Sequence, residues 1–294
     1  MIEIESGMII KGIGGFFYVD VGDKIYECKG RGSLKGKKNQ LYPGDEVKIN
    51  LLENDKAVIE EILPRRNVLK RPKVSNLDQI MVVISTCEPN PNFLVIDKLL
   101  VVAESKDIEP ILIITKTDLK SHEDIYNMYT NAGFTTYKFS IKDESDLENI
   151  KKSLNGKKSA FIGNSGVGKS TLLNAIDTSL NLKTQKISNK LGRGKHTTRE
   201  VEFFKLFGGY VADTPGFSAV DIEKSGLSEI DCNMIPEYFR EFNKYRGKCK
   251  FNSCSHTSEK ECEILRALRD NEIEESRYKS YISLLEEMKN NKRF

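Results

Sequence analysis

Residues 163–170, GNSGVGKS, match the pattern GxxxxGK[ST] of a phosphate-binding loop. In such a loop, successive backbone N–H groups surround the phosphates and the following helix points its positive N-terminus at them. Lys169 is expected to reach the β- and γ-phosphates, and the Ser170 hydroxyl to bind Mg²⁺. The sequence therefore predicts a nucleotide site whose phosphate contacts come from Gly163, Asn164, Ser165, Gly166, Val167, Gly168, Lys169, Ser170 and Thr171.

A second phosphate motif, Asp213-Thr214-Pro215-Gly216, lies downstream of this loop. It follows the apolar residues 210–212, which have the composition of a buried strand. We expect Asp213 to hold Mg²⁺ through water and the N–H of Gly216 to contact the γ-phosphate.

The segment GRGKHTT, residues 192–198, lies between these motifs, where a loop that senses the γ-phosphate belongs. One threonine should complete the Mg²⁺ shell, and we favour Thr198 over Thr197. The attacking water also needs an orienting side chain, which Phe217, after the DTPG motif, cannot supply. His196 is the nearest suitable residue. The alternative is that His196 contacts RNA or solvent.

The segment Thr115-Lys116-Thr117-Asp118 predicts a clamp for guanine. Asp118 can accept hydrogen bonds from guanine N1–H and N2–H₂, and an unpaired carboxylate would penalise adenine. The stem of Lys116 should lie along the base. Thr115 stands where Asn is usual, and its hydroxyl is expected to replace one amide contact. Ser140, after the run 137–139, is expected to offer its backbone N–H to guanine O6.

The order of these motifs is unusual, because the base clamp precedes the phosphate loop and in an ordinary GTPase it follows. A rotated order leaves a core intact if the original termini are joined and the chain is reopened elsewhere. It also places the switch end of the domain next to a cysteine cluster.

That cluster, Cys249-x4-Cys254-x-His256-x5-Cys262, offers three thiolates and an imidazole. This is a ligand set for a closed tetrahedral zinc site, which would be structural because no position is left open. The alternative is four residues together by chance.

The elements that must position these motifs fall into three predicted domains. Residues 1–68 contain short β-type runs at 16–21, 24–28, 46–51 and 56–62 between glycine turns, which favours an oligonucleotide-binding (OB) barrel, with an SH3-like barrel as the alternative. Residues 69–225 alternate buried strands and helices, as expected of an α/β P-loop domain that begins with a linker through residue 73. Residues 226–294 are expected to form a helical zinc-binding domain.

Composition is that of a globular chain, with 38% hydrophobic and 30% charged residues. The net charge is only +3, but residues 29–44 and 181–199 carry basic side chains and no acidic ones, which suits RNA. The sequence has no apolar run long enough for a membrane span and no signal peptide, so we expect a cytoplasmic protein.

The barrel, the permuted motif order, GRGKHTT before DTPGF and the C-x4-C-x-H-x5-C tail together resemble the ribosome small-subunit-dependent GTPase A family of bacterial circularly permuted GTPases. The resemblance spans essentially the whole chain. It implies a GTPase that binds the 30S subunit and its 16S rRNA, is stimulated by the subunit and acts in late small-subunit maturation. It also implies that the barrel and zinc domain contact rRNA and that the residue matching His196 is catalytic. The partners expected are GTP and GDP, with Mg²⁺ and one Zn²⁺, but neither DNA nor membrane, and the chain is expected to be a monomer.

Two other functions fit the same motifs. One is a nucleotide-gated RNA chaperone whose hydrolysis is incidental. The other is a permuted GTPase of the large subunit, against which the N-terminal barrel and the cysteine cluster argue. Turnover with isolated 30S and 50S subunits would separate the three.

Overall fold

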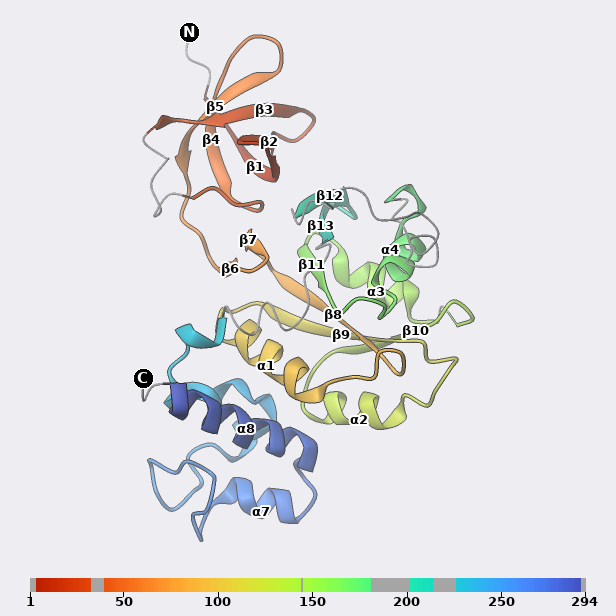
Figure 1. Cartoon of the computed structure of the whole chain (residues 1–294), viewed down its shortest axis with the longest axis vertical. Coiled ribbons are helices and arrows are strands. Elements are labelled where there is room, and N and C mark those ends of the chain that lie inside the picture. Colours follow the sequence, from red (N-terminus) through yellow and green to blue (C-terminus); the bar gives the residue numbers. More distant parts are fainter. Residues whose placement is uncertain (1–3, 33–39, 144, 181–200, 214–225, 292–294) are drawn as a thin grey trace.

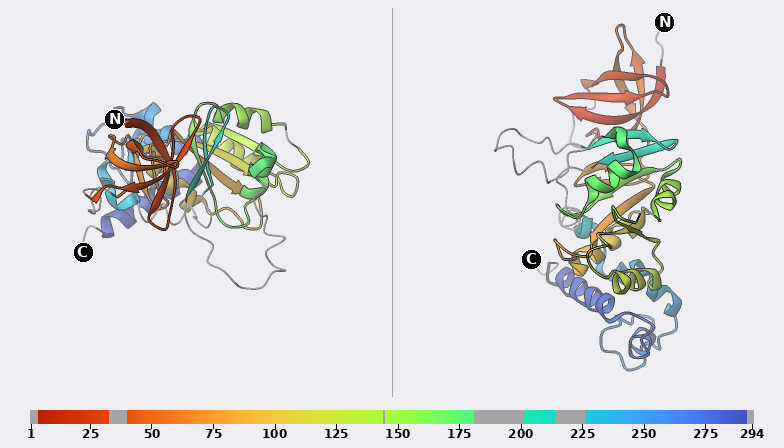
Figure 2. Two further views of the ribbon diagram at one scale, coloured as in Figure 1. Left: turned by 90° about the horizontal axis from the view of Figure 1, so that it is seen from above. Right: turned by 90° about the vertical axis from the view of Figure 1, so that its right-hand side faces the viewer.

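The computed structural model describes residues 4–32, 40–143, 145–180, 201–213 and 226–291. Three parts follow one another along the longest axis of the molecule (Figure 1). A β-barrel lies at one end, an α/β sheet in the middle and a helical part at the other end, and the same sequence of parts is visible from the side (Figure 2). The predicted multidomain architecture is therefore confirmed.

The N-terminal part is a closed barrel of five strands, β1 (Ile4–Ile13), β2 (Phe16–Asp20), β3 (Ile25–Gly30), β4 (Glu46–Leu51) and β5 (Lys56–Ile62). Their order is β1-β2-β3-β5-β4, and β4 pairs with β1 to close the ring. Strands β3 and β5 are parallel and the other pairs antiparallel. Alternate residues such as Val47 and Ile49 fill the interior because side chains along a strand point to opposite faces.

The expected linker is partly a β-hairpin, formed by β6 (Val68–Lys70) and β7 (Lys73–Ser75). It is fastened to the barrel by the fully buried Asp45. The Asp45 carboxylate accepts hydrogen bonds from the Arg65 guanidinium and the Ser75 hydroxyl, each at 2.6 Å. Since a buried carboxylate needs such partners, the connection between barrel and sheet is an ordered one.

The central sheet has the order β10-β9-β8-β11-β13-β12. Its strands are β8 (Gln79–Ser85), β9 (Glu109–Thr115), β10 (Thr136–Phe139), β11 (Lys158–Ile162), β12 (Glu202–Leu206) and β13 (Gly209–Asp213). All neighbours are parallel except β12, which runs antiparallel to β13 at the edge. The carboxyl ends of the five parallel strands therefore meet at one edge of the sheet.

Helices cover both faces of this sheet. Helices α1 (Phe93–Glu104) and α2 (Glu123–Asn131) pack on the face that carries Ile80, Val82 and Ile84 of β8. Helices α3 (Leu147–Leu154) and α4 (Lys169–Ile176) pack on the other face, with Met81 and Val83. A strand that alternates between two buried faces must be apolar throughout, which explains the continuous run in the sequence.

The C-terminal part contains α7 (Glu263–Arg269) and α8 (Glu275–Asn291), preceded by the 3₁₀ turns η4 (Leu227–Glu229), η5 (Cys232–Tyr238) and η6 (Arg240–Tyr245). A further 3₁₀ turn, η3 (Thr178–Leu180), follows α4. Apolar residues of the C-terminal part, such as Phe239 and Tyr281, share one core with α1 and α2. This part is therefore packed directly on the α/β domain.

A buried ionic cluster joins α8 to α1 inside that core. Arg277 is almost fully buried and donates to Asp97 on α1 at 2.5 Å and to Glu241 at 2.7 Å. Tyr129 of α2 also donates to Asp97, at 3.1 Å. Burial opposes the charge on Arg277, but the two carboxylates raise its pKa above the ordinary value.

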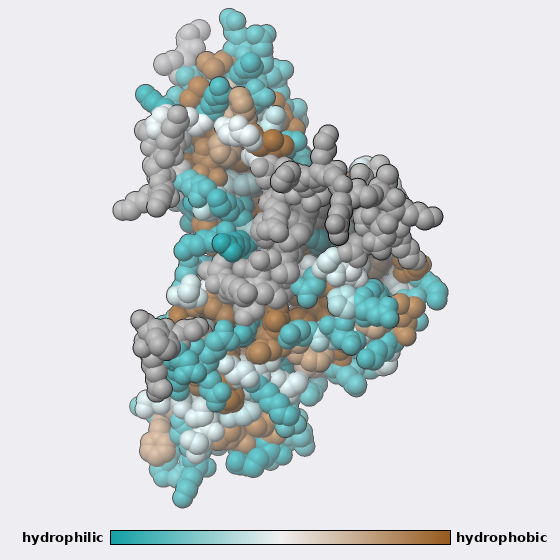
Figure 3. All heavy atoms as spheres, viewed as in Figure 1, coloured by the Kyte–Doolittle hydropathy of each residue, from teal (hydrophilic) through white to brown (hydrophobic). Residues whose placement is uncertain are grey.

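Hydrophilic side chains spread over both ends of the face shown in Figure 3. Among the described residues, no helix combines the length and the apolar character needed to cross a membrane.

We predict that Arg277→Met destabilises the protein by about 3–5 kcal/mol, because it leaves Asp97 and Glu241 buried without their cation. Urea unfolding followed by circular dichroism measures the change. Arg266→Met is the matched control, since Arg266 also pairs with acidic residues, in its case Glu263, Asp270 and Glu272, but lies at the surface. Equal shifts of the two unfolding midpoints would contradict the importance of burial.

Candidate functional site

The phosphate loop connects β11 to α4, as the sequence predicts. Gly168 caps α4 with φ +96°, a left-handed conformation that favours glycine. A Cβ at Gly163 would lie 2.7 Å from the carbonyl oxygen of Val83. Only glycine therefore fits at Gly163 without a shift in β8. The N-terminus of α4, with Lys169 and Ser170 in its first turn, lies at the carboxyl edge of the sheet.

Thr115 ends β9 and lies against this loop. Its hydroxyl is within hydrogen-bond distance of the carbonyl oxygens of Val167, at 2.5 Å, and Ile84, at 3.1 Å. A hydroxyl has one proton, so these two acceptors share it. Thr115, which stands where Asn is usual, therefore contacts the phosphate loop. Its hydroxyl connects this loop to the ends of β8 and β9.

The rest of the predicted clamp follows Thr115 at the same edge. Lys116 has φ +58°, and its ammonium donates to the carbonyl oxygens of Cys87 (3.2 Å) and Glu88. Asp118 is an exposed residue whose side chain is only 15% accessible, and it forms an ion pair with Lys142, with 3.3 Å between Nζ and Oδ2. Lys142 is a residue of this site that was not predicted from the sequence. Its position two residues after Ser140, beyond a strand that adjoins the clamp strand, was the available signal.

Ser140 is buried at the start of the loop after β10. Its backbone N–H donates to the carbonyl of Asp143 at 3.1 Å, and its hydroxyl accepts from the N–H of Asp143 at 3.0 Å. The expected donor to guanine O6 is therefore engaged within its own loop in this structure. Ser140 shapes the loop, and its neighbour Ile141 is 70% exposed beside it.

Asp213 is the last residue of β13, and its Cα is paired with Phe161 of β11, just before the phosphate loop. The backbone thus brings Asp213 and Ser170 to the same edge of the sheet. Hydroxyl and carboxylate oxygens are ligands that Mg²⁺ prefers. The other residues predicted here, His196, Thr197, Thr198, Gly216 and Phe217, lie outside the described part of the chain.

The four residues Cys249, Cys254, His256 and Cys262 come together, with their ligand atoms all within 4.8 Å of one another. His256 Nδ1 lies 3.6 Å from Cys249 Sγ and 3.4 Å from Cys262 Sγ, and these two sulfurs are 3.9 Å apart. A tetrahedral ion with Zn–S bonds of about 2.3 Å requires sulfur atoms about 3.8 Å apart. The donor set and spacing therefore fit zinc.

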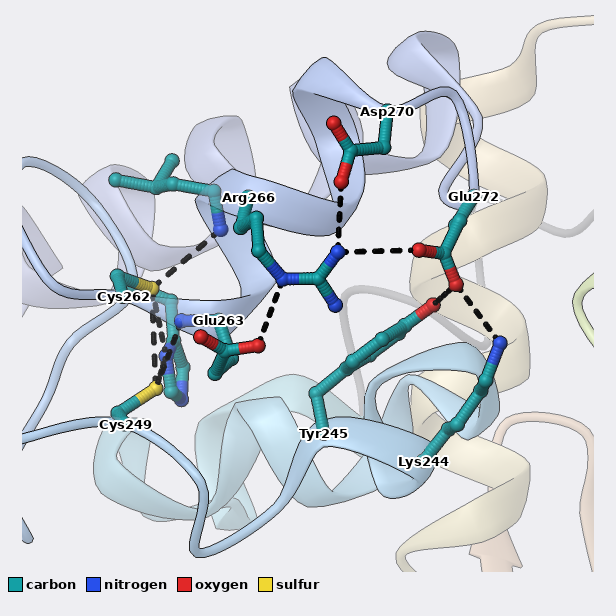
Figure 4. A network of polar contacts seen from close by, with 10 residues as sticks. Lys244, Tyr245, Cys249, Cys262, Glu263, Arg266, Asp270 and Glu272 are labelled. Atoms are coloured by element: carbon teal, nitrogen blue, oxygen red, sulfur yellow. Dashed lines mark hydrogen bonds and ion pairs between the residues drawn. The ribbon is translucent and has the colours of Figure 1, made fainter.

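The surroundings hold the cluster in this geometry (Figure 4). Backbone N–H groups of Glu263 and Leu265 donate to the sulfurs of Cys249 and Cys262 at 3.4 and 3.5 Å. Tyr278 donates to the His256 carbonyl at 2.9 Å. N–H···S bonds offset negative charge on sulfur, as a thiolate site needs.

Glu259 closes the loop between Cys254 and Cys262. Burial opposes its ionisation, but hydrogen bonds from the hydroxyl and N–H of Ser255 and from other loop N–H groups lower its pKa to about 2. It is therefore a carboxylate at neutral pH and organises the loop around the cluster.

The chain matches two family models along most of its length. The model described as RsgA N-terminal domain matches residues 6–59, and the one described as RsgA GTPase matches residues 62–223. The first match coincides with the barrel and the second includes the whole nucleotide edge of the sheet.

Known proteins resemble the chain from end to end. It is 42% identical to the small ribosomal subunit biogenesis GTPase RsgA of Caldanaerobacter subterraneus subsp. tengcongensis, over 98% of this chain and 97% of that one. It is 41% identical to the protein of the same name from Ruminiclostridium cellulolyticum, over 97% and 94%. The crystal structure of YloQ, a circularly permuted GTPase, matches with a TM-score of 0.78 and 33% identity, over 98% of this chain and 96% of that one. The chain therefore belongs to the RsgA family of circularly permuted GTPases, enzymes that hydrolyse GTP.

Proposed function

We propose that this GTPase binds the 30S ribosomal subunit, hydrolyses GTP with stimulation by that subunit and acts in late small-subunit maturation. The observation that carries the proposal is the likeness, over nearly the full length of both chains, to relatives named small ribosomal subunit biogenesis GTPase. A factor of bacterial ribosome assembly works in the cytoplasm, and we expect it to act as a monomer.

In this proposal the segment Thr115-Lys116-Thr117-Asp118 binds guanine. Asp118 accepts from the base, and the Lys116 stem lies beside it. Because Thr115 joins the clamp strand to the loop carbonyl of Val167, base binding and phosphate binding use one connected framework. The Ile141 N–H, next to Ser140, replaces the Ser140 N–H as the donor to guanine O6.

The residues around the phosphates carry out GTP hydrolysis in this proposal. Lys169 and the loop N–H groups hold the β- and γ-phosphates, and Ser170, Asp213 and Thr198 would hold Mg²⁺, with Gly216 at the γ-phosphate. The ion, when bound, neutralises charge that develops on the phosphate oxygens. His196 orients the attacking water, because Phe217 has no polar group with which to do so.

The RNA contacts are proposed to come from the barrel and the zinc-binding part. On the barrel, Lys29 projects from β3 with its ammonium 4.8 Å from the centre of the Phe16 ring. An exposed cation beside an aromatic ring is the combination that RNA-binding surfaces use for phosphates and unpaired bases. The basic residues that follow Lys29 in the sequence, up to Lys38, are proposed to contribute further phosphate contacts.

We predict that the protein rejects ATP by at least about a thousandfold relative to GTP, because adenine leaves Asp118 unpaired. Asp118→Asn should shift the preference towards xanthine nucleotides, which offer an acceptor where guanine has its amine. Titration with labelled nucleotides measures both. Comparable affinities of the unaltered protein for ATP and GTP would show that Asp118 is no clamp.

We predict about one zinc ion for each chain, from the four-ligand set. Cys254→Ala should loosen the region after residue 240 and leave GTP binding nearly intact, since the cluster lies beside α7 in the C-terminal part and the phosphate loop between β11 and α4 in the central domain. Metal analysis and limited proteolysis test this. Cys28→Ala, at the buried cysteine of the barrel, is the control and should retain the zinc. Protein purified without chelator that contains no zinc would refute the assignment.

We predict that 30S subunits raise GTP turnover many-fold, that 50S subunits do not, and that salt abolishes the effect, because phosphate contacts release counterions. His196→Ala should lower the stimulated rate by roughly ten- to a thousandfold with little change in GTP affinity. Multiple-turnover phosphate release measures both. Equal stimulation by 50S subunits would favour a permuted GTPase of the large subunit. Binding to 30S subunits without stimulation of turnover would favour the RNA chaperone.

A further inference from the structure

The barrel is attached to the GTPase domain at the β12–β13 hairpin, which lies directly beside it in both views (Figures 1 and 2). This hairpin has a special place in the chain. It begins just after the predicted γ-phosphate loop and ends at Asp213. In the sequence, the hairpin therefore joins two predicted parts of the phosphate site, the segment 192–198 and Asp213, and the barrel contacts this hairpin.

Polar contacts hold both ends of β12 to the barrel. Lys11 of β1 forms an ion pair with Glu202, the first residue of β12, at 2.9 Å. At the other end, Lys205 donates to the carbonyl of Gly22. The barrel thus contacts the edge strand at two separate points, through a side chain at one and a backbone carbonyl at the other.

A buried contact reinforces the ion pair. Tyr210 of β13 donates to Asp20 of β2 at 3.0 Å, and Asp20 is nearly inaccessible to solvent. Burial and the bond to Asp20 raise the pKa of Tyr210 to about 12, so Tyr210 remains a donor at neutral pH. Met8 and Ile10 of β1 belong to the same hydrophobic core as Phe203 of β12. The attachment therefore combines charge, a buried hydrogen bond and apolar packing.

The pairing of the two hairpin strands connects the barrel contact at Glu202 to the predicted Mg²⁺ ligand Asp213. Glu202 is paired directly with Asp213 across the two strands. Paired strands move together because their backbone hydrogen bonds fix their relative position. A force applied to Glu202 is thus transmitted to the backbone of Asp213.

We propose that Glu202 is a positioning residue for GTP hydrolysis, through which the barrel sets the place of Asp213. This inference rests on the proposed function, since it assigns a route by which a subunit bound to the barrel reaches Mg²⁺ and the γ-phosphate. Lys11 is its partner on the barrel, and Tyr210 with Asp20 keeps the hairpin seated.

A second ion pair between the same two domains provides a matched control. Glu46 of β4 pairs with Lys158 at 2.6 Å, but Lys158 begins β11, at the amino end of the sheet and away from the phosphate loop. Glu46 and Glu202 are similarly exposed, at 51% and 42%. If any contact between barrel and GTPase domain sufficed, both pairs would matter equally.

The test compares Glu202→Gln, Glu46→Gln and the exchange Lys11→Glu with Glu202→Lys in the full chain. Glu202→Gln should lower subunit-stimulated kcat by about two- to fivefold, the range of one half-exposed ion pair. It should raise the Mg²⁺ concentration for half-maximal binding of a fluorescent GTP analogue by a similar factor. Subunit binding, measured by sedimentation, should not change. The exchange should restore both quantities, and Glu46→Gln should alter neither.

Several outcomes would overturn the inference. One is equal effects of Glu46→Gln and Glu202→Gln, and another is no effect of Glu202→Gln on either quantity. A fall in subunit binding that accounts for the lower rate would also overturn it. If the unaltered protein is not stimulated by 30S subunits, the proposed function fails, whereas the Mg²⁺ titration without subunits still decides whether Glu202 positions Asp213.

Discussion

The parallel pairing of β10, β9, β8, β11 and β13 is the constraint on which the site depends. Parallel strands place all their carboxyl ends at one edge, and a ligand binds outside that edge. The proposed clamp begins with the last residue of β9, the Ser140 loop follows β10, the predicted phosphate loop follows β11 and Asp213 ends β13. The order of the motifs in the chain is immaterial to this arrangement, which is why a permuted sequence can build a GTPase site.

Within that edge the parts are bonded to one another before any nucleotide arrives. Thr115 joins β9 to the phosphate loop, Lys116 joins the clamp to the loop after β8, and Lys142 pairs with Asp118. A preformed site loses less conformational freedom when its ligand binds. The Asp118–Lys142 pair also gives the carboxylate of the proposed clamp a cationic partner.

The two flanking parts are attached to the α/β domain in different ways. The C-terminal part shares a continuous hydrophobic core with α1 and is fixed by the buried Arg277 cluster, in which the removal of one partner is costly. The barrel has a core of its own and meets the sheet through the ion pairs of Lys11 and Glu46, the hydrogen bond to Asp20 and the apolar packing of Met8 and Ile10 with Phe203. The two ion pairs are partly exposed and therefore weak individually, which suits an attachment that responds to a bound partner.

The sequence by itself determined the chemistry of the protein. Phosphate binding needs glycines and a lysine at fixed spacing, and a zinc site needs four ligands close in the chain, so residues 163–170 and the Cys249–Cys262 cluster were recognisable without a structure. The buried strands were recognisable as well, because burial on both faces requires an unbroken apolar run such as β8. The hairpin inside the expected linker was not, since its short strands are held by Asp45, which is distant from Ser75 in sequence.

Only the tertiary structure decided which residues from separate segments meet. The ion pairs Asp118–Lys142 and Lys11–Glu202, the Thr115–Val167 bond and the burial of Arg277 against Asp97 all join positions far apart in the chain. The residues in these contacts are of common types and belong to no local sequence motif. Composition alone does not indicate which lysine pairs with which glutamate. Strand register and helix packing select the actual pairs, and these arise only when the whole chain is folded.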